Sequence, residues 1–137
     1  MVSESDSEQV NEKLQLVSLR VCLATGEIPK AVVTLNIEGT EETGSATGDG
    51  VVDASYKAVE SIAPSKSNLL LYSVNNITTG TDAQGEVSVR LEKDGRIVNG
   101  NGADTDIVIA SVKAYVNALN RLNQSQYSVH PQLSGTE

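Results

Sequence analysis

The sequence predicts an α+β fold of two βββα units, in which each antiparallel three-stranded sheet is backed by one helix. The first observation is an internal repeat, since ATGDGVVDASYKAV at residues 46–59 returns as ADTDIVIASVKAY at residues 103–115, with ASYKA and ASVKA in register. The second is that three short segments of alternating or β-branched residues precede each copy. A three-stranded sheet needs a helix against one face, and one unit alone buries too little apolar surface, which gives the repeat a structural explanation.

The first unit is expected over residues 14–63. Apolar residues alternate through LQLVSLRVCL, and the run AVVTLNIEG is β-branched and bounded by glycine, so the two form a hairpin around the turn TGEIPK. The segment EETGSATG supplies a short third strand. A helix then starts after Gly-Asp-Gly and stops at Pro64, which cannot continue it.

The second unit is expected over residues 68–122 in the same order. Strands are predicted in LLLYSVNNITTGT, in the alternating EVSVRLE and, after the turn KDGR, in IVNGNG. The helix DTDIVIASVKAYVNALNRL opens with Asp104 as the expected N-cap. Residues 1–13 are polar, as a linker cut from a longer protein would be, and residues 123–137 are expected to be a disordered tail or to cover a neighbour.

Composition excludes several classes of function. The formal charge of −8 argues against binding to nucleic acid or to an anionic membrane, which needs clustered Lys and Arg. No segment approaches the ~18 apolar residues of a membrane span and the polar N-terminus is unlike a signal peptide, so we expect a cytoplasmic protein, or one of the plastid stroma if the source is a plant. The single cysteine, Cys22, is expected to pack as a small hydrophobe, and the single histidine, His130, lies in the tail.

The turn ATGDG allows two interpretations. Gly48 and Gly50 can be residues that lead a strand into a helix at positive φ, with Asp49 or Asp53 adding favourable charge to the first helical turn. A helix start reached through glycines also leaves backbone N–H groups open to an anion. The carboxylates would repel a phosphate, but amides and Asp together could hold a zwitterion, the amides its carboxylate and Asp its ammonium. An amino acid fits that description.

No group of residues indicates catalysis. With one His, one Cys and no Walker-type loop, the chain shows no nucleophile with a base and no metal site of Cys and His. Asp104 and Asp106 could be a metal fragment, but their place at a helix start is the favoured explanation. This chain is therefore not expected to be an enzyme by itself or to hold a cofactor.

Three segments together resemble the C-terminal regulatory domain of 2-isopropylmalate synthase, the committed enzyme of leucine biosynthesis. They are ATGDGVVDASYKAV, LLLYSVNNITTGTDAQGEVSVRL and GRIVNGNGADTDIVIASVKAYVNALNRL, and the resemblance covers residues 14–122. It implies a homodimeric domain that binds the end-product amino acid between its units, near the dimer interface, and passes that event to the catalytic domain of the same chain. That catalytic domain, with its divalent metal and its acetyl-CoA and 2-oxoisovalerate chemistry, would precede residue 1.

The resemblance also implies which residues contact the effector, leucine or another branched-chain amino acid. Leu69 and Tyr72 would form an apolar wall for its side chain, and the glycine turn would receive its backbone end. Tyr72 also fits ordinary strand packing with its hydroxyl in solvent. The positions carried over are Gly48, Asp49, Gly50, Val52, Asp53, Ala54, Leu69, Tyr72, Asn76 and Ala83.

Two residues depart from the family pattern. Val51 stands where Pro is common, so the turn loses a fixed φ. Asn76 stands where a small apolar residue is more usual, and an amide facing a leucine side chain needs a partner or costs about 1–3 kcal/mol. A leucine feedback sensor and a dimerisation scaffold of a feedback-insensitive synthase, its pocket spoiled at Asn76, therefore both stay open. The related citramalate synthases, whose domain answers to isoleucine, fit the last segment less well.

Overall fold

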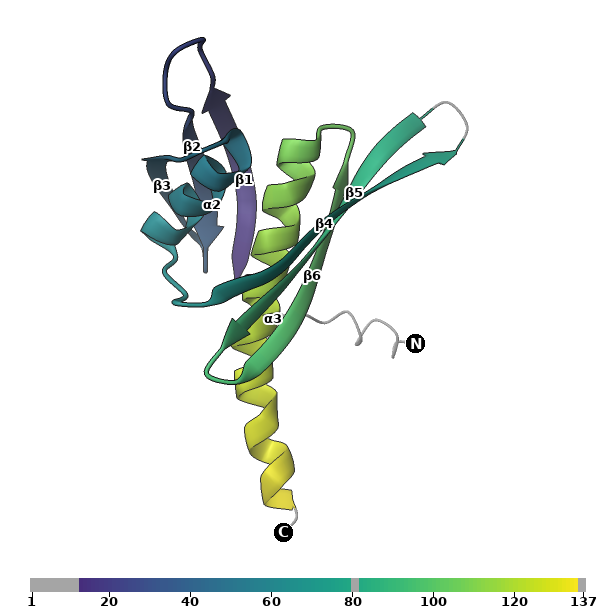
Figure 1. Cartoon of the computed structure of the whole chain (residues 1–137). Helices are drawn as coiled ribbons and strands as arrows, with labels where there is room; N and C mark the ends of the chain where they lie inside the picture. The colour runs from purple at the N-terminus through teal and green to yellow at the C-terminus, as the bar shows by residue number, and fades with distance from the viewer. Residues whose placement is uncertain (1–12, 80–81, 136–137) are drawn as a thin grey trace.

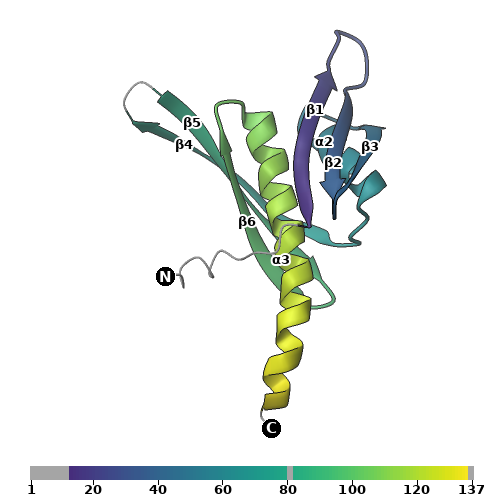
Figure 2. The same ribbon diagram turned by 180° about the vertical axis from the view of Figure 1, so that it is seen from behind.

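Two three-stranded antiparallel sheets, each followed by a helix, make up the structure, which confirms the predicted α+β class with its two βββα units (Figure 1, Figure 2). The computed structural model describes residues 13–79 and 82–135, with side chains for residues 13–75 and 84–123. The strand order is β1-β2-β3 in one sheet and β4-β5-β6 in the other. The elements are β1 (Leu14–Cys22), β2 (Lys30–Ile37), β3 (Thr40–Thr47), α2 (Val51–Ile62), β4 (Asn68–Thr79), β5 (Asp82–Lys93), β6 (Arg96–Asp104) and α3 (Ile107–Gly135).

The central strand of each sheet supplies buried side chains that face a helix. Every second residue of these strands points to the same face, so alternate apolar residues form one continuous surface. The buried residues are Ala31, Val33 and Leu35 in β2, and Val87, Val89 and Leu91 in β5. The two sets are offset by 56 residues, and the same offset separates Ser55 in α2 from Ser111 in α3. The repeat seen in the sequence therefore extends through the packing of both units.

A β-bulge interrupts the first strand of each sheet at a matching place. In β1 the register shifts between Leu16 and Ser18, and in β4 it shifts between Leu69 and Leu71. A bulge moves the residues that follow it to the opposite face of the sheet. Cys22 consequently lies on the face away from α2, at the end of an edge strand, and is exposed. The expectation that it packs as a small hydrophobe is wrong.

Helix α3 lies so close to β6 that two positions of this strand must be glycine. A Cβ on Gly100 would overlap backbone atoms of Ala114 and Ala118, and a Cβ on Gly102 would overlap the backbone at Ala114. From this position α3 also contacts β5, β1 and α2, and both views show it between the two sheets (Figure 1, Figure 2). The second helix is therefore shared by both units.

Buried tyrosines and Glu60 join the two helices. The rings of Tyr56 in α2 and Tyr115 in α3 stack, with centroids 4.2 Å apart and planes 14° apart. The Tyr115 hydroxyl donates to Glu60 Oε2 at 2.7 Å, and Ser65 donates to the same carboxylate through its N–H at 3.0 Å and its hydroxyl at 2.7 Å. Burial raises the pKa of both phenols, so they stay neutral and keep their donor protons. In the part of the chain that the structure describes, no buried side-chain nitrogen or oxygen lacks a partner.

The start of β1 is fastened to α3 by Asn120. The Oδ1 atom of this buried side chain accepts the N–H of Leu14 at 3.0 Å, and its Nδ2 donates to the carbonyl of Leu14 at 2.9 Å. One side-chain amide thus makes the two bonds that a residue of a neighbouring strand would make. We call this pair of bonds the Asn120 clamp.

Helix α3 begins and ends later than the sequence analysis expected. Asp106 caps it, because its Oδ1 accepts the N–H of Val108 at 2.8 Å. Asp104 still belongs to β6, where it pairs with Gly85, so the expectation that Asp104 is the N-cap is wrong. The helix continues to Gly135, through the segment for which a disordered tail was expected.

The N-terminal segment and the lengths of the helices bear on the expected linker and on the expected absence of a membrane span. Apart from Lys13, the expected linker over residues 1–13 lies outside the described residues. Neither helix of the described ranges is long and apolar enough to cross a membrane.

Gly100→Ala is expected to destabilise the chain by about 1–3 kcal/mol, because the added methyl must push α3 away from β6. Gly44 is the matched control in the first unit, since a Cβ there meets chiefly the side-chain ends of Ser61 and Ile62, which can move. Gly44→Ala should therefore cost less. Urea unfolding followed by circular dichroism measures both variants, and equal losses would show that the close approach of α3 is not the constraint.

Asn120→Ala is expected to cost about 1–3 kcal/mol, because it leaves the N–H and the carbonyl of Leu14 without partners. Hydrogen exchange should show the amide of Leu14 losing its protection while amides of β5 keep theirs. Asn117→Ala serves as the control, since Asn117 also accepts a backbone N–H, that of Asn101 at 3.0 Å, but at an exposed site. A Leu14 amide that stays protected in Asn120→Ala would contradict the role of the clamp.

Candidate functional site

Close packing requires glycine at position 48 but not at position 50, and neither residue has a left-handed backbone. Gly48 is buried, and a Cβ on it would lie 2.5 Å from Asp53 Oδ2 and 2.6 Å from Ala54 N. Its N–H donates to the carbonyl of Pro29 at 3.2 Å. Gly50 is extended, with φ −151° and ψ 175°, and a Cβ there would face open space. The expectation of positive φ at these glycines is wrong, because an extended residue leads into the helix.

Asp53 folds back onto the turn. Its Oδ2 accepts the N–H of Asp49 at 3.0 Å and forms an ion pair with Lys57 at 3.2 Å. The hydrogen bond from the Asp49 backbone lowers the pKa of the Asp53 carboxyl, and Lys57 adds to this effect. Asp53 is the third residue of α2, and its carboxylate reaches back past the N-cap residue Gly50 to the N–H of Asp49. Asp53 is therefore engaged within its own helix start, whereas Asp49 is exposed.

The two helices begin differently, although the repeat aligns their first turns. Asp106 stands where the first unit has Gly50, and its Oδ1 accepts the N–H groups of Val108 at 2.8 Å and Ile109 at 3.4 Å. No side chain caps the N-terminus of α2. The first N–H groups of α2 thus lie behind a glycine, while a carboxylate closes the start of α3. A helix start of the first kind attracts anions.

Val52 and Ala54 fix this helix start from the inside. Ala54 is fully buried, and its N–H donates to the carbonyl of Gly50 at 2.9 Å. Val52 is partly buried and packs against the core. The structure therefore places Ala54 in the core and leaves Asp49 and the partly buried Gly50 to form the outer surface of the turn.

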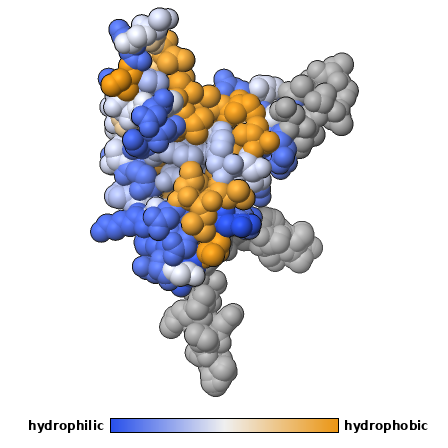
Figure 3. Space-filling model, in the orientation of Figure 1, coloured by the Kyte–Doolittle hydropathy of each residue, from blue (hydrophilic) through white to orange (hydrophobic). Residues whose placement is uncertain are grey.

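Leu69 and Tyr72 lie on the helix-facing side of β4 but are not covered. Leu69 pairs with Leu91 and Tyr72 pairs with Val89, and both partners are buried. Leu69 is nevertheless 46% exposed and Tyr72 37%, because β4 is an edge strand and α3 lies over β5 and β6. Figure 3 shows apolar surface over the beginning of β4. The exposed apolar side chains of this strand, which we call the β4 patch, are Leu69, Leu70, Leu71, Tyr72 and Val74.

In the first unit, the positions of β1 that correspond to Leu69 and Tyr72 are covered by other parts of the chain. Leu16 pairs with Leu35 and Leu19 pairs with Val33, so they correspond to Leu69 and Tyr72 in the repeat. Both are partly buried against the core, and α3 packs against their strand. The repeat therefore leaves apolar surface open in the second unit where the first unit is covered.

The hydroxyl of Tyr72 is held inside the protein and not in solvent. It lies 2.7 Å from Ser111 Oγ, and the Tyr72 ring meets Tyr56 edge-on, with centroids 6.4 Å apart and planes 73° apart. Tyr56 follows Val52 by one helical turn, so it connects the start of α2 with β4. Tyr56 and Ser111 were not among the predicted site residues, although both lie in the repeated ASYKA and ASVKA segments.

The remaining two candidate positions lie farther along the β4–β5 hairpin. The backbone of Asn76 pairs with Gly85, and that of Ala83 pairs with Thr78. Their side chains lie outside the described residues. The structure therefore brings eight of the candidates into two groups, one at the start of α2 and one on β4, with Tyr56 between the groups.

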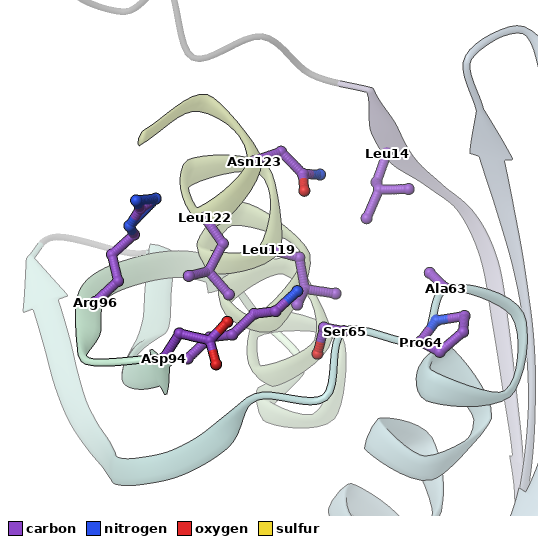
Figure 4. A pocket seen from close by; sticks show the side chains of 10 residues that line it. Leu14, Ala63, Pro64, Ser65, Asp94, Arg96, Leu119, Leu122 and Asn123 are labelled. Carbon is purple, nitrogen blue, oxygen red and sulfur yellow. The ribbon is translucent and has the colours of Figure 1, made fainter. Parts of the chain in front are cut away.

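A cavity of about 190 Å³ lies elsewhere, beside α3 and the first residue of β1 (Figure 4). Apolar side chains form much of its lining, and charged side chains of the β5–β6 turn reach it. It contains none of the candidate residues. The lining residues are Leu14, Ala63, Pro64, Ser65, Lys93, Asp94, Arg96, Leu119, Leu122 and Asn123.

The described residues contain no group of three or more His, Cys, Asp or Glu side chains that could hold a metal ion.

Comparison with known proteins identifies similar chains. The model of the LeuA allosteric (dimerisation) domain family matches residues 1–123. The chain is 59% identical over 133 residues to 2-isopropylmalate synthase of Methylococcus capsulatus, 53% identical over 133 residues to that of Thiobacillus denitrificans and 58% identical over 132 residues to that of Dechloromonas aromatica. These alignments cover 97%, 97% and 96% of the chain but 26% of each relative, so the chain spans about a quarter of their length.

Gly48→Ala is expected to destabilise the chain by about 1–3 kcal/mol, because the turn must open to admit the methyl. Gly50→Ala has open space and should cost less than about 1 kcal/mol, the difference in preference for the N-cap position. Urea unfolding of the two variants compares them directly. A Gly50 variant that loses as much stability as the Gly48 variant would contradict the open geometry at Gly50.

Proposed function

Because the chain belongs to the family of LeuA allosteric (dimerisation) domains, we propose that it dimerises and binds leucine as the regulatory domain of a 2-isopropylmalate synthase. The observation that carries this proposal is the uncapped start of α2 behind Gly50, within a chain matched to that family over residues 1–123. We further propose that the synthase chemistry, with its divalent metal, belongs to the rest of such a protein, of which this chain spans about a quarter.

The leucine carboxylate binds at the glycine turn. The first N–H groups of α2 supply donors there, and the partial positive charge of the helix start adds to the attraction. Gly48 and Gly50 carry no side chain that would block approach. The ammonium group binds Asp49, which is exposed beside the turn, since Asp53 is already paired with Lys57.

The leucine side chain packs against Leu69 and Tyr72. Both present apolar surface on the side of β4 that faces the helices, and Tyr56 links this surface to α2. A branched aliphatic chain gains from burial at such a wall about 25 cal/mol per Å² of apolar area. The wall and the turn together recognise both ends of one amino acid.

A second copy of the chain covers the β4 patch. Contiguous exposed apolar residues are typical of an interaction surface, and a two-fold dimer uses the same patch on both subunits. The first unit supports this arrangement, because its matching residues, Leu16 and Leu19, are partly buried. The candidate site is open in the single chain, so the dimer also closes the site.

Regulation follows from differential affinity. Leucine shifts the synthase toward its inhibited state only if it binds that state more tightly than the active one. Asn76 is the residue that favours the alternative function, a dimerisation scaffold that does not respond to leucine, because an amide that faces a leucine side chain needs a hydrogen-bond partner. Isoleucine as the effector would instead place the chain with the citramalate synthases.

Titration of the chain with leucine, isoleucine and valine, together with light scattering, tests the proposal. We expect saturable heat with leucine alone, about one ligand per chain, on a dimer. Heat with isoleucine alone supports the citramalate synthase alternative. A folded dimer that binds none of the three supports the scaffold, and Asn76→Ala should then restore leucine binding. A monomer contradicts the proposed use of the β4 patch.

Gly50→Asp locates the carboxylate site, because it gives α2 the cap that Asp106 gives α3. The new carboxylate should occupy the N–H groups and repel the ligand, so leucine affinity should fall at least about tenfold, an effect of about 1.4 kcal/mol. The fold should be as stable or slightly more stable, since Asp is a better N-cap than Gly. Thr47→Asp is the control, because it adds the same charge at an exposed strand end without capping the helix. Equal losses in both variants would contradict binding at the helix start.

A further inference from the structure

The two helices carry a serine at the same position of the repeat. Ser55 and Ser111 are both fully buried, and each hydroxyl donates to the carbonyl four residues earlier, Val51 and Ile107 respectively, at 2.7 Å. The two side chains are therefore alike in burial and in their local hydrogen bond.

Ser111 differs because two tyrosines reach it. Tyr56 donates to its backbone carbonyl at 2.9 Å, and the Tyr72 hydroxyl lies 2.7 Å from its Oγ. A serine hydroxyl has one proton, and Ser111 donates that proton to Ile107. Tyr72 must therefore be the donor in its bond to Ser111. Its own proton is used within the protein, and only the lone pairs of its oxygen remain.

This bond holds an otherwise loosely packed ring. Tyr72 lies on an edge strand and is 37% exposed. Its described aromatic contact is the edge-on one with Tyr56, which is itself stacked on Tyr115. Tyr72 is thus the outermost of three rings, and the bond to Ser111 fixes its outer end against α3.

We propose that Ser111 is a positioning residue of the effector site, holding Tyr72 through its hydroxyl so that the ring forms a fixed wall; this rests on the proposed function. The fixed ring needs no further ordering when the effector binds, which reduces the entropic cost of binding. Because the Tyr72 proton is already donated, the wall offers no hydrogen-bond donor to the effector side chain. It therefore selects aliphatic side chains by shape.

Ser111→Ala tests the proposal, with Ser55→Ala as the matched control that removes the same local bond from the other helix. In titrations with leucine, Ser111→Ala should lower the affinity about three- to tenfold, the range expected for one hydrogen bond, while Ser55→Ala should leave it unchanged. Tyr72→Phe should lower it by a similar factor. The double variant of Ser111→Ala with Tyr72→Phe should be no weaker than either single variant, because both remove one interaction. A residue with only a structural role would not give this non-additivity.

The ligand-free chain gives a second, independent measurement. NMR of tyrosine-labelled protein should show the Tyr72 ring resonances moving toward the values of a freely rotating ring in Ser111→Ala and staying in place in Ser55→Ala. Unchanged Tyr72 resonances in Ser111→Ala overturn the proposal, and so does an equal effect of both serine variants on leucine affinity. A native chain that binds no leucine overturns the proposed function and this inference with it, whereas native binding with no selective effect of Ser111→Ala overturns this inference alone.

Discussion

The approach of the α3 backbone to the β6 backbone is the constraint on which the rest of the structure depends. Gly100 and Gly102 have no Cβ, so α3 can lie directly on the strand. A helix held at this distance reaches β1 and α2 as well as its own sheet, and the two units thereby gain a common core. The stacking of Tyr56 on Tyr115 and the hydrogen bonds to Glu60 all require α3 to be in this place. A larger residue in β6 would separate the units before it disturbed either sheet.

Divergence between the two halves of the repeat is what produces a candidate site. The halves share central strands, bulges and buried helix serines. They differ in whether a side chain caps the helix start and in whether the apolar side chains of the first strand are covered. Gly50 leaves a helix start uncapped where Asp106 closes the other. Tyr72 lies uncovered where Leu19 packs against the core. The features that the two halves share thus build the fold, and the features in which they differ form the candidate site.

Sequence reasoning reached the fold because its signals are local. Alternation in the central strands, glycines and Pro64 at element ends and the repeated helix opening each depend on neighbouring residues. It expected Cys22 to pack as a small hydrophobe because the residue stands in an apolar run. After the β1 bulge, Val21 pairs with buried Ala31 and Cys22 pairs with exposed Lys30, so Cys22 lies on the outer face. It chose Asp104 over Asp106 because pairing with Gly85 keeps Asp104 in the strand, and pairing is a long-range property. Asn120 and Ser111 were not singled out because their partners come from distant elements. Family resemblance predicted that the glycine turn, Leu69 and Tyr72 belong to the site. Only the structure shows the contacts that hold these residues in place.

The Asn120 clamp has a mechanical meaning. Leu14 opens β1, and its backbone is attached to α3 at both its N–H and its carbonyl. Tension applied to the main chain at Leu14 is therefore shared by two bonds side by side, which yield together and not one after the other. Strand and helix are joined here across 106 residues of sequence. We therefore expect them to resist a pull as one body up to a threshold and then to separate in a single step.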